Sequence, residues 1–260
     1  DLSFINRIHL TFDYYNEETS EALYEVPLSM TSGTTTMMQN IGTIRNRGIE
    51  FSVNAAVMQK RDFRWNAYAN VTYNQNRVVK LATDDPIETD FQIIEEGRPY
   101  RQFYMKEYAG VDYDTGKPLW YLNESGDETT GDYNAAAKRY VGSADPKVLG
   151  GFGTSVNWKG LDFNIDFTYR LGGKVYNYGA PFTGYGMSLM SPLREVAVDS
   201  WTEDNKGAKH PQYIPGDPYN ATKDSSRFLY SGNYLKIGNI TLGYTLPAKW
   251  TKKAFIQKLR

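Results

Sequence analysis

The sequence has 260 residues, no cysteine and a formal net charge of −1 at pH 7, and aromatic residues make up 15% of it. The absence of cysteine excludes disulfides, thiolate metal sites and cysteine nucleophiles. The near-neutral charge, without a basic patch interleaved with aromatic residues, argues against a nucleic-acid partner, and neither His9 nor His210 has a second histidine at metal-ligand spacing.

The first eighty residues contain three segments in which apolar and polar side chains alternate, which predicts strands with one apolar and one polar face. These segments cover residues 5–15, about 44–57 and 63–79. In the third, Trp65, Ala67 and Ala69 share one face, while arginine, asparagine and threonine side chains fill the other.

Three more alternating segments follow. They cover about 147–158, 161–176 and 234–246, and a seventh strand is expected to start within 255–260. Two glycine pairs, Gly150-Gly151 and Gly172-Gly173, are expected to mark bends or close backbone approach. Pro247 ends the sixth segment because proline cannot donate a hydrogen bond to a strand ladder.

The connections between these segments alternate between long and short. The long ones cover about 17–40, 80–142 and 177–232, and the short ones lie at 59–62, at 159–160 and after Pro247. In an up-and-down antiparallel sheet all short turns then lie at one end, as in outer-membrane barrels with short periplasmic turns and long extracellular loops. Within the second long connection we expect a hairpin of residues 103–112 and 117–123.

The apolar face fits a lipid environment. Mean hydropathy is −0.57, and no run approaches the ~20 apolar residues of a membrane helix, but barrel strands alternate and average to near neutrality. Phe63 and Tyr73 are ten positions apart, which spans roughly 25 Å at ~3.3 Å per residue and ~40° tilt, the height of a lipid-facing band. Because Tyr and Trp suit membrane interfaces, we expect these interface aromatics: Phe63, Trp65, Tyr73, Trp158 and Trp250.

Arg45 and Arg47 conflict with this pattern because they have the same parity as Ile49, on the apolar face. A bulge at Gly48 would turn them away from lipid. Alternatively the register slips there, or the two side chains reach lipid headgroup phosphates near the outer end of the strand.

Several short motifs resemble those of the SusC/RagA-type TonB-dependent transporters. They are Asn40-Ile41-Gly42, Asn46-Arg47-Gly48-Ile49-Glu50, Trp65-Asn66-Ala67, Glu96-Gly97-Arg98-Pro99, Ala109-Gly110-Val111-Asp112, Thr115-Gly116-Lys117-Pro118, Gly142-Ser143-Ala144-Asp145-Pro146 and Leu235-Lys236-Ile237-Gly238-Asn239-Ile240-Thr241-Leu242-Gly243-Tyr244. Their order fits the C-terminal third of that family. Each motif is weak alone, and together they span nearly the whole chain.

The resemblance implies an all-β fold: residues 1–260 would be the C-terminal part of a 22-stranded transmembrane barrel, contributing about six to seven strands. It implies import of an oligosaccharide or peptide, energy from TonB and a SusD-like lipoprotein lid. The plug domain that contacts TonB is absent from this chain, so we expect the sequence to be part of a longer polypeptide located in the outer membrane.

Candidate site residues are few. Aromatic side chains in the long connections suit stacking on sugar rings, contacts with peptides, or burial against a lid. These weak candidates for substrate binding are Tyr104, Tyr108, Trp120, Tyr121, Tyr185 and Trp201. Asp112 and Asp114 form only a partial calcium-loop pattern, because Thr115 stands where a third ligand is needed. A polar turn is the favoured interpretation, and no cofactor is expected.

Two other functions stay open from the residues alone. A soluble or surface β-rich module that binds glycans would also be rich in aromatic residues. An outer-membrane enzyme would need a catalytic pair, and no local pattern marks one among the thirty acidic residues. We therefore expect no catalytic residues.

Overall fold

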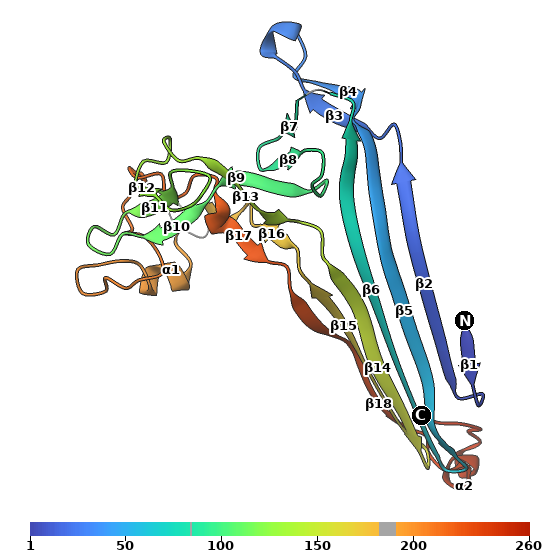
Figure 1. Ribbon diagram of the computed structural model, residues 1–260. Coiled ribbons are helices and arrows are strands. Elements are labelled where there is room, and N and C mark those ends of the chain that lie inside the picture. The colour runs from blue at the N-terminus through green and yellow to red at the C-terminus, as the bar shows by residue number, and fades with distance from the viewer. Residues whose placement is uncertain (84, 182–190) are drawn as a thin grey trace.

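The computed structural model of the protein describes residues 1–83, 85–181 and 191–260. Seven antiparallel strands form one long, curved sheet (Figure 1). In spatial order the strands are β1 (Leu2–Phe4), β2 (Ile8–Thr19), β5 (Gly42–Lys60), β6 (Phe63–Leu81), β14 (Val148–Trp158), β15 (Leu161–Leu171) and β18 (Tyr234–Tyr244). Spatial order follows chain order, so the sheet is an up-and-down meander, as the alternating pattern predicts.

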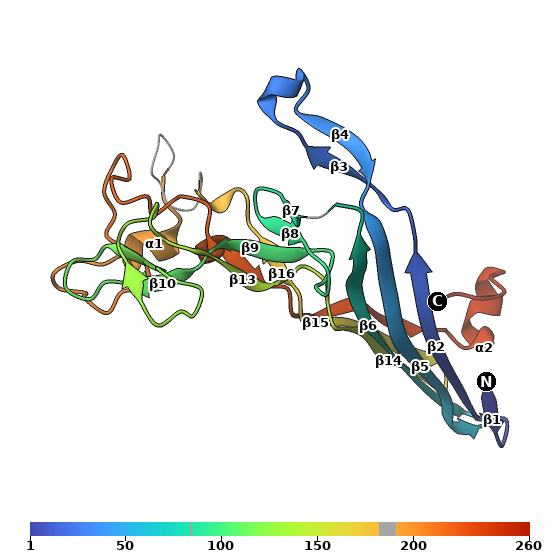
Figure 2. The ribbon, with the colours of Figure 1, turned by 45° about the horizontal axis from the view of Figure 1, so that its top comes forward.

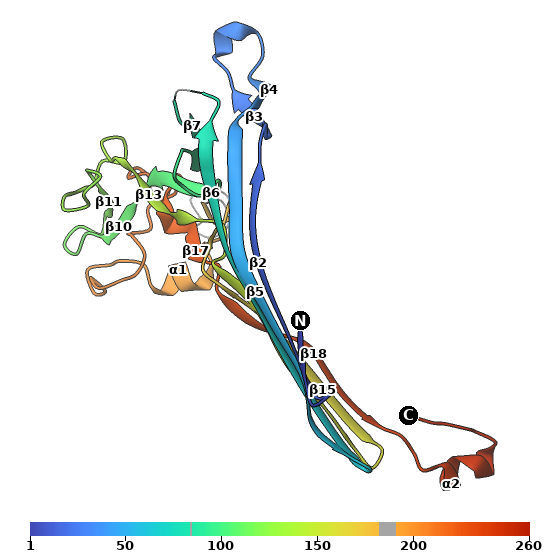
Figure 3. The same cartoon turned by 45° about the vertical axis from the view of Figure 1, so that its right-hand side comes forward.

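Smaller elements gather at the upper end of this sheet, and most lie on one side of it (Figures 1 and 3). They are the hairpin of β3 (Leu23–Pro27) and β4 (Thr36–Asn40) with η1 (Met30–Ser32); the sheet of β7 (Ile87–Glu88), β8 (Gln92–Ile94), β9 (Gln102–Lys106) and β13 (Lys138–Ser143); the sheet of β10 (Tyr108–Val111), β11 (Pro118–Tyr121) and β12 (Thr129–Thr130); the pair β16 (Lys174–Tyr176) and β17 (Leu229–Ser231); and the helices α1 (Arg194–Val198) and η3 (Ser226–Phe228). At the lower end lie α2 (Ala248–Thr251) and η4 (Lys252–Ala254). None of the described helices has the length and apolar character needed to cross a membrane.

Buried side chains lie in the smaller elements and at their junction with the large sheet. One cluster contains Ile41, Val78, Leu81, Ile87 and Ile94, a second Ala180, Val196 and Phe228, and a third Phe103, Met105 and Val141. Below this junction the apolar side chains of the large sheet pack into none of these three clusters. The core therefore stabilises the upper region, and the sheet below it forms a single layer (Figure 2).

The outer limits of two predicted segments are wrong. Ile5 and Asn6 have φ values of 51° and 50°, so the first long strand begins at Ile8 and a tight turn links it to β1, which we did not predict. Residues 255–260 form no strand. Pro247 is instead the N-cap residue of the short helix α2, and a backbone hydrogen bond from Leu246 N to the Leu259 carbonyl joins the last residues to the extension of β18.

The fifth segment is broken where the glycine pair predicts a bend. Gly172 and Gly173 have φ values of 81° and 75°, a region that favours glycine. A Cβ on Gly173 would lie 2.8 Å from the carbonyl oxygen of Ala144. The chain therefore leaves the large sheet here, and β16 pairs with β17 instead of continuing β15.

The predicted hairpin of residues 103–112 and 117–123 is confirmed only in its inner part. β10 pairs with β11 across the turn at residues 112–116. The preceding residues form β9, which pairs with β13, 32 to 41 positions away. Sequence alternation could not distinguish these partners, because each of these strands is only four to six residues long.

No bulge occurs at Gly48. The register of β5 is unbroken from Ile44 to Ala55 against β2, and from Ile44 to Ala56 against β6. Shifts occur instead at Thr43/Ile44 and at Ala56/Met58. Arg45 and Arg47 therefore stay on the apolar side of the sheet, above its last apolar row.

Candidate functional site

The large sheet has one apolar face, which is exposed along most of its length. Exposed large side chains on this face include Phe12 (61%), Phe152 (40%), Ile240 (58%) and Leu242 (71%). They alternate with polar side chains along every long strand, as period two requires. In water this surface would be far larger than the apolar patches that soluble monomers expose, so it needs an apolar solvent or a partner.

The opposite face carries a network of polar side chains. Tyr68 on β6 donates to Asp166 Oδ1 on β15 at 2.9 Å, and Asn164 Nδ2 donates to Asp166 Oδ2 at 2.7 Å. Higher up, Asn76 donates to Asn46 Oδ1 at 2.9 Å. Amides, hydroxyls and carboxylates along this face hydrogen-bond across strands and remain accessible to water, which suits the wall of a polar lumen.

Three tyrosine side chains each extend over a glycine on the adjacent strand and hydrogen-bond to the strand beyond it. Tyr68 lies directly opposite Gly153, which lies opposite Asp166. On the same polar face, Tyr15 crosses Gly48 and donates to Asn74 Oδ1 at 3.0 Å. On the apolar face, Tyr169 crosses Gly150 and donates to the carbonyl of Asn70 at 3.1 Å. Written as tyrosine, glycine and hydrogen-bond acceptor, the three crossings are Tyr15–Gly48–Asn74, Tyr68–Gly153–Asp166 and Tyr169–Gly150–Asn70. Each crossing links three strands and fixes their register.

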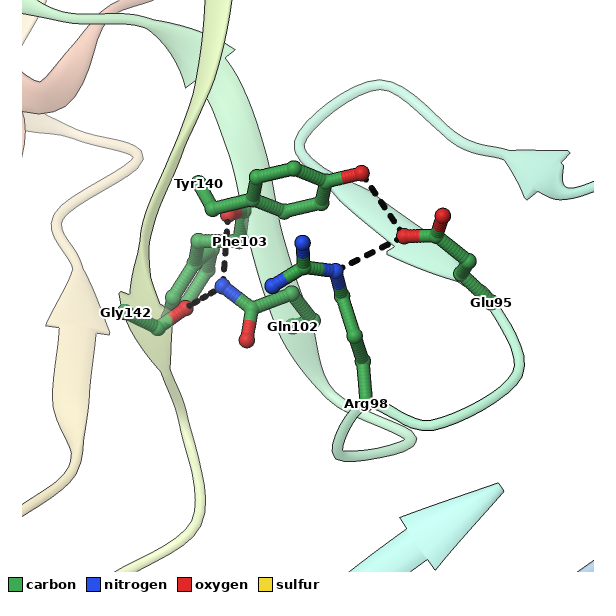
Figure 4. Close-up of polar contacts among 6 residues, drawn as sticks. All are labelled: Glu95, Arg98, Gln102, Phe103, Tyr140 and Gly142. Carbon is green, nitrogen blue, oxygen red and sulfur yellow. Dashed lines mark hydrogen bonds and ion pairs between the residues drawn. The ribbon is translucent and has the colours of Figure 1, made fainter. Parts of the chain in front are cut away.

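The loop region at the upper end presents an exposed ladder of rings and charges. The Arg98 guanidinium lies 3.3 Å from the centroid of the Tyr140 ring, and Tyr140 lies 5.0 Å from Tyr104. Glu95 accepts from Arg98 Nε at 2.8 Å and from Tyr140 Oη at 2.7 Å, as Figure 4 shows. Lys138 extends the ladder, with its ammonium 5.7 Å from the Tyr104 ring. Two adjacent rings, tilted by 41° and flanked by both charge signs, can contact an amphipathic ligand.

Below this ladder, a buried amide completes the strand pairing. The register of β13 against β9 shifts between Tyr140 and Gly142, which is a bulge. Gln102 is buried and its Nε2 donates to the carbonyls of Gly142 at 2.7 Å and Phe103 at 3.1 Å (Figure 4). The side chain thus satisfies carbonyl groups at the bulge and holds the strand that carries Tyr140.

The comparisons with known proteins match this architecture. The family model for the TonB dependent receptor-like β-barrel matches residues 2–178, which is well over half of the chain. The chain belongs to this family. TonB-dependent receptor P3 of Formosa agariphila is 30% identical over 99% of the chain, and TonB-dependent receptor SusC of Bacteroides thetaiotaomicron is 25% identical over 98%.

Solved TonB-dependent transporters of the SusC/RagA type share the fold. The structure of the RagAB peptide transporter aligns with a TM-score of 0.80 and 32% identity, over 94% of this chain. The RagAB peptide importer in the open-open state aligns with a TM-score of 0.79 and 32% identity. The chain spans 27% and 26% of the P3 and SusC receptors, and 28% of the first RagAB chain.

The sheet is therefore a segment of an outer-membrane TonB-dependent receptor barrel, as the alternation and the motifs predicted. Its apolar face contacts lipid and its polar face lines the lumen. The loop region lies at the end opposite the short turns, on the extracellular side. This family consists of receptors and transporters and not of enzymes.

Four of the predicted interface aromatics lie on barrel strands, near the ends of the apolar face or beside a short turn. Trp65, Tyr73 and Trp158 are 38%, 43% and 53% exposed, and Phe63 is half-buried. Trp65 Nε1 donates to Thr154 Oγ1 at 2.8 Å on the neighbouring strand, so its one polar atom is satisfied on the lipid side. Trp250 lies in the short helix α2 instead, 61% exposed at the periplasmic end.

Two of the six candidate substrate aromatics belong to the loop core. Trp120 and Trp201 are 1% and 4% exposed. The Trp201 ring fills the space above Gly116, where a Cβ would lie 2.4 Å from Cδ2, and its Nε1 donates to the Tyr113 carbonyl at 2.8 Å. The loops pack around both rings, which leaves little of either ring accessible to a ligand.

The other four candidates have different positions. Tyr185 lies outside the described residues. Tyr104 belongs to the exposed ladder, and Tyr121 lies half-buried with the Arg139 guanidinium 4.6 Å from its ring centroid. Tyr108 borders a cavity of about 270 Å³, and burial raises the pKa of its hydroxyl to about 12.

Tyr140 and Arg98 were not among the candidates predicted from the sequence. Both lie inside or beside motifs of the family, but neither stands in a pattern that marks a ligand. Their contact depends on β9 pairing with β13, which brings residues of distant segments together, and only that pairing would have identified them.

Asp112 forms a polar turn. Its Oδ1 accepts from Thr115 Oγ1 at 2.6 Å and from Thr115 N at 2.7 Å, and these two hydrogen bonds lower the pKa of Asp112. The carboxylate of Asp114 lies 4.0 Å from Lys206 Nζ, a cation that opposes calcium binding. Within the described residues no group of three His, Cys, Asp or Glu side chains is placed to hold a metal ion.

We predict that Asp112 acts through this turn and not through calcium. In the full-length protein Asp112→Asn keeps an acceptor for Thr115 and should leave the loop intact, whereas Asp112→Ala should destabilise it locally by about 1 kcal/mol. Limited proteolysis with and without a chelator checks this. Protection that depends on calcium and is lost in both variants would instead establish a calcium loop.

Proposed function

We propose that the chain is a wall segment of an importer that carries oligopeptides or oligosaccharides across the outer membrane, with energy from TonB acting through a plug domain and a SusD-like lipoprotein as the extracellular lid. The observation that supports this most is the two-faced sheet joined to an extracellular loop region. Because an open sheet edge is not viable in lipid, strands outside this chain complete the wall.

Peptides are the first candidate cargo. The solved relatives at 32% identity are described as a peptide transporter and a peptide importer. In this chain the exposed ladder presents Arg98 and Lys138 beside Glu95 and Glu88. A peptide carries both charge signs and apolar side chains, so two adjacent rings flanked by charges of both signs suit it.

Oligosaccharides are the second candidate, because Tyr104 and Tyr140 offer ring faces in the same ladder and sugars stack on such rings. In either case the cargo binds at the extracellular loops, and movement of the plug opens a route along the polar face. That route requires no covalent chemistry, and we propose no enzymatic activity.

Uptake by cells tests this function. The full-length gene with its adjacent lipoprotein gene is returned to a deletion strain, and growth is measured on a peptide mixture and on oligosaccharides as sole nutrients. Growth on at least one cargo should depend on the gene and disappear in a strain without TonB. Growth that is unchanged by deletion on every cargo, or that persists without TonB, would contradict the proposal.

The exposed ladder can be tested separately with purified full-length protein and the cargo found above. Tyr140→Ala and Arg98→Ala should weaken cargo binding by about threefold to thirtyfold, since a cation–π contact and one ring face are lost. Tyr113→Ala is the matched control, because Tyr113 is 65% exposed elsewhere on the loops. Equal affinity of all three variants would show that cargo binds away from the ladder.

A further inference from the structure

Three arginines lie on the lipid-facing side of the barrel, directly above its apolar band. The last apolar row across β2, β5 and β6 is Tyr14–Ile49–Tyr73, and the two rows above it are Asn16–Arg47–Gln75 and Glu18–Arg45–Arg77. Paired residues share a face, so all nine side chains project outward from the barrel. We call Arg45, Arg47 and Arg77 the arginine cluster; the strands that carry it lie side by side in Figure 1.

The charges of these rows do not balance. Three guanidinium groups face one carboxylate, which leaves a net charge of two positive. Arg45 and Arg77 are direct cross-strand partners, an arrangement in which like charges destabilise a sheet. Glu18 compensates little, because it lies 3.7 Å from Arg45 and its side chain is 49% exposed.

Most donors of the cluster are available. Arg47 Nε donates to Gln75 Oε1 at 2.8 Å, which uses one of its five N–H groups. Among the described residues no acidic side chain pairs with Arg47 or Arg77. A Cβ on Gly97 would lie 3.2 Å from Arg77 Nη2, so the guanidinium lies against this glycine, and Arg77 is exposed.

The height of the cluster matches a headgroup layer. At ~3.3 Å per residue and ~40° tilt, Arg47 lies roughly 5 Å and Arg45 roughly 10 Å above Ile49 along the membrane normal. The polar layer on each side of the hydrocarbon is roughly 5–7 Å thick. Arg47 therefore lies within this layer, and the backbones of Arg45 and Arg77 lie roughly 3–5 Å beyond it, a distance that a long arginine side chain can span.

We propose that the arginine cluster is a binding site for the phosphate groups of anionic lipids in the outer leaflet. Planar guanidinium groups bind phosphate oxygens in pairs, and an anion between Arg45 and Arg77 offsets their repulsion. The ligand is a lipid and not a free ion, because the cluster is continuous with the apolar band, where Tyr14, Ile49 and Tyr73 can pack against the acyl chains of the same molecule.

Native mass spectrometry of the full-length protein in detergent tests the site, with phosphatidylglycerol, phosphatidylcholine and inorganic phosphate as probes. The wild type should retain phosphatidylglycerol in preference to phosphatidylcholine. Replacing all three arginines by glutamine should weaken this retention by at least about tenfold, since each cation near an anionic membrane surface contributes to attraction. Arg64→Gln is the control, because Arg64 has the same charge and the opposite parity, facing the lumen.

Two results would overturn the proposal: equal retention of phosphatidylglycerol by the wild type and the triple variant, or displacement of that lipid by inorganic phosphate at similar concentration, which would indicate a general anion site. Heat-dependent gel mobility verifies that each variant is folded. If the triple variant does not fold, Arg47→Gln alone is used, and a preference for phosphatidylglycerol unchanged by it would equally contradict the site.

Discussion

Val53→Arg should prevent stable assembly of the full-length barrel, at a cost of about 2–4 kcal/mol, whereas Ser52→Arg should be tolerated. The two positions are neighbours on β5 and differ only in the face they occupy. Val53 pairs with Leu10 and Ala69 in the middle of the apolar band. A charge there loses its hydration, because lipid tails offer no polar partner.

Ser52 is the matched control because it pairs with Thr11 and Asn70 on the polar face. Its arginine would reach water in the lumen, so only the position of the charge differs between the variants. Outer-membrane levels, heat-dependent gel mobility and urea unfolding in lipid vesicles measure the outcome. If the chain were instead a soluble glycan-binding module, Val53 would lie in a protein core and not in lipid, and the protein would purify without detergent.

The long strands could be predicted because period two acts at every position of a wall that separates lipid from water. Each strand of the sheet repeats the same constraint, so errors were confined to ends, such as the turn at Ile5 and Asn6 and the helix after Pro247. In these places no second strand fixes the backbone, and local residue preferences decide the conformation.

The loop region could not be predicted to the same extent. Trp120 and Trp201 lie in the long connections, where aromatic side chains were expected at the surface. Both are buried, because the loops need their own hydrophobic core above the membrane. Tyr140 and Arg98 meet only because β9 selects β13 and not its sequence neighbour. Such pairings depend on long-range contacts that alternation in a single short strand does not encode.

Gly48 shows how a correct observation led to a wrong interpretation. The glycine is required, but by the Tyr73 backbone and the Tyr15 ring and not by a bulge: a Cβ at Gly48 would lie 2.2 Å from the Tyr73 carbonyl oxygen and 2.6 Å from the Tyr15 hydroxyl oxygen. Glycine weakens a strand on its own, and an aromatic side chain that covers it from the neighbouring strand restores packing. The same arrangement recurs at Gly150 and Gly153.

Gly153→Ala should therefore destabilise the barrel by about 1–3 kcal/mol, the usual cost of an extra methyl group in a packed site. Its Cβ would lie 2.6 Å from Asp166 Oδ1, 2.7 Å from Tyr68 Cε1 and 2.8 Å from the carbonyl oxygen of Ile165. Tyr68 would have to leave the glycine, and its 2.9 Å hydrogen bond to Asp166 would break.

Gly238→Ala is the matched control. Gly238 lies on β18 in the same sheet, and the nearest atom to its Cβ would be the Asp166 carbonyl oxygen at 3.7 Å, an ordinary contact. Urea unfolding of the full-length protein in vesicles compares the two variants, and Gly153→Ala combined with Tyr68→Ala should recover part of the loss because one of the three close contacts disappears. Equal stability of the two single variants would show that the tyrosine crossing does not hold these strands in register.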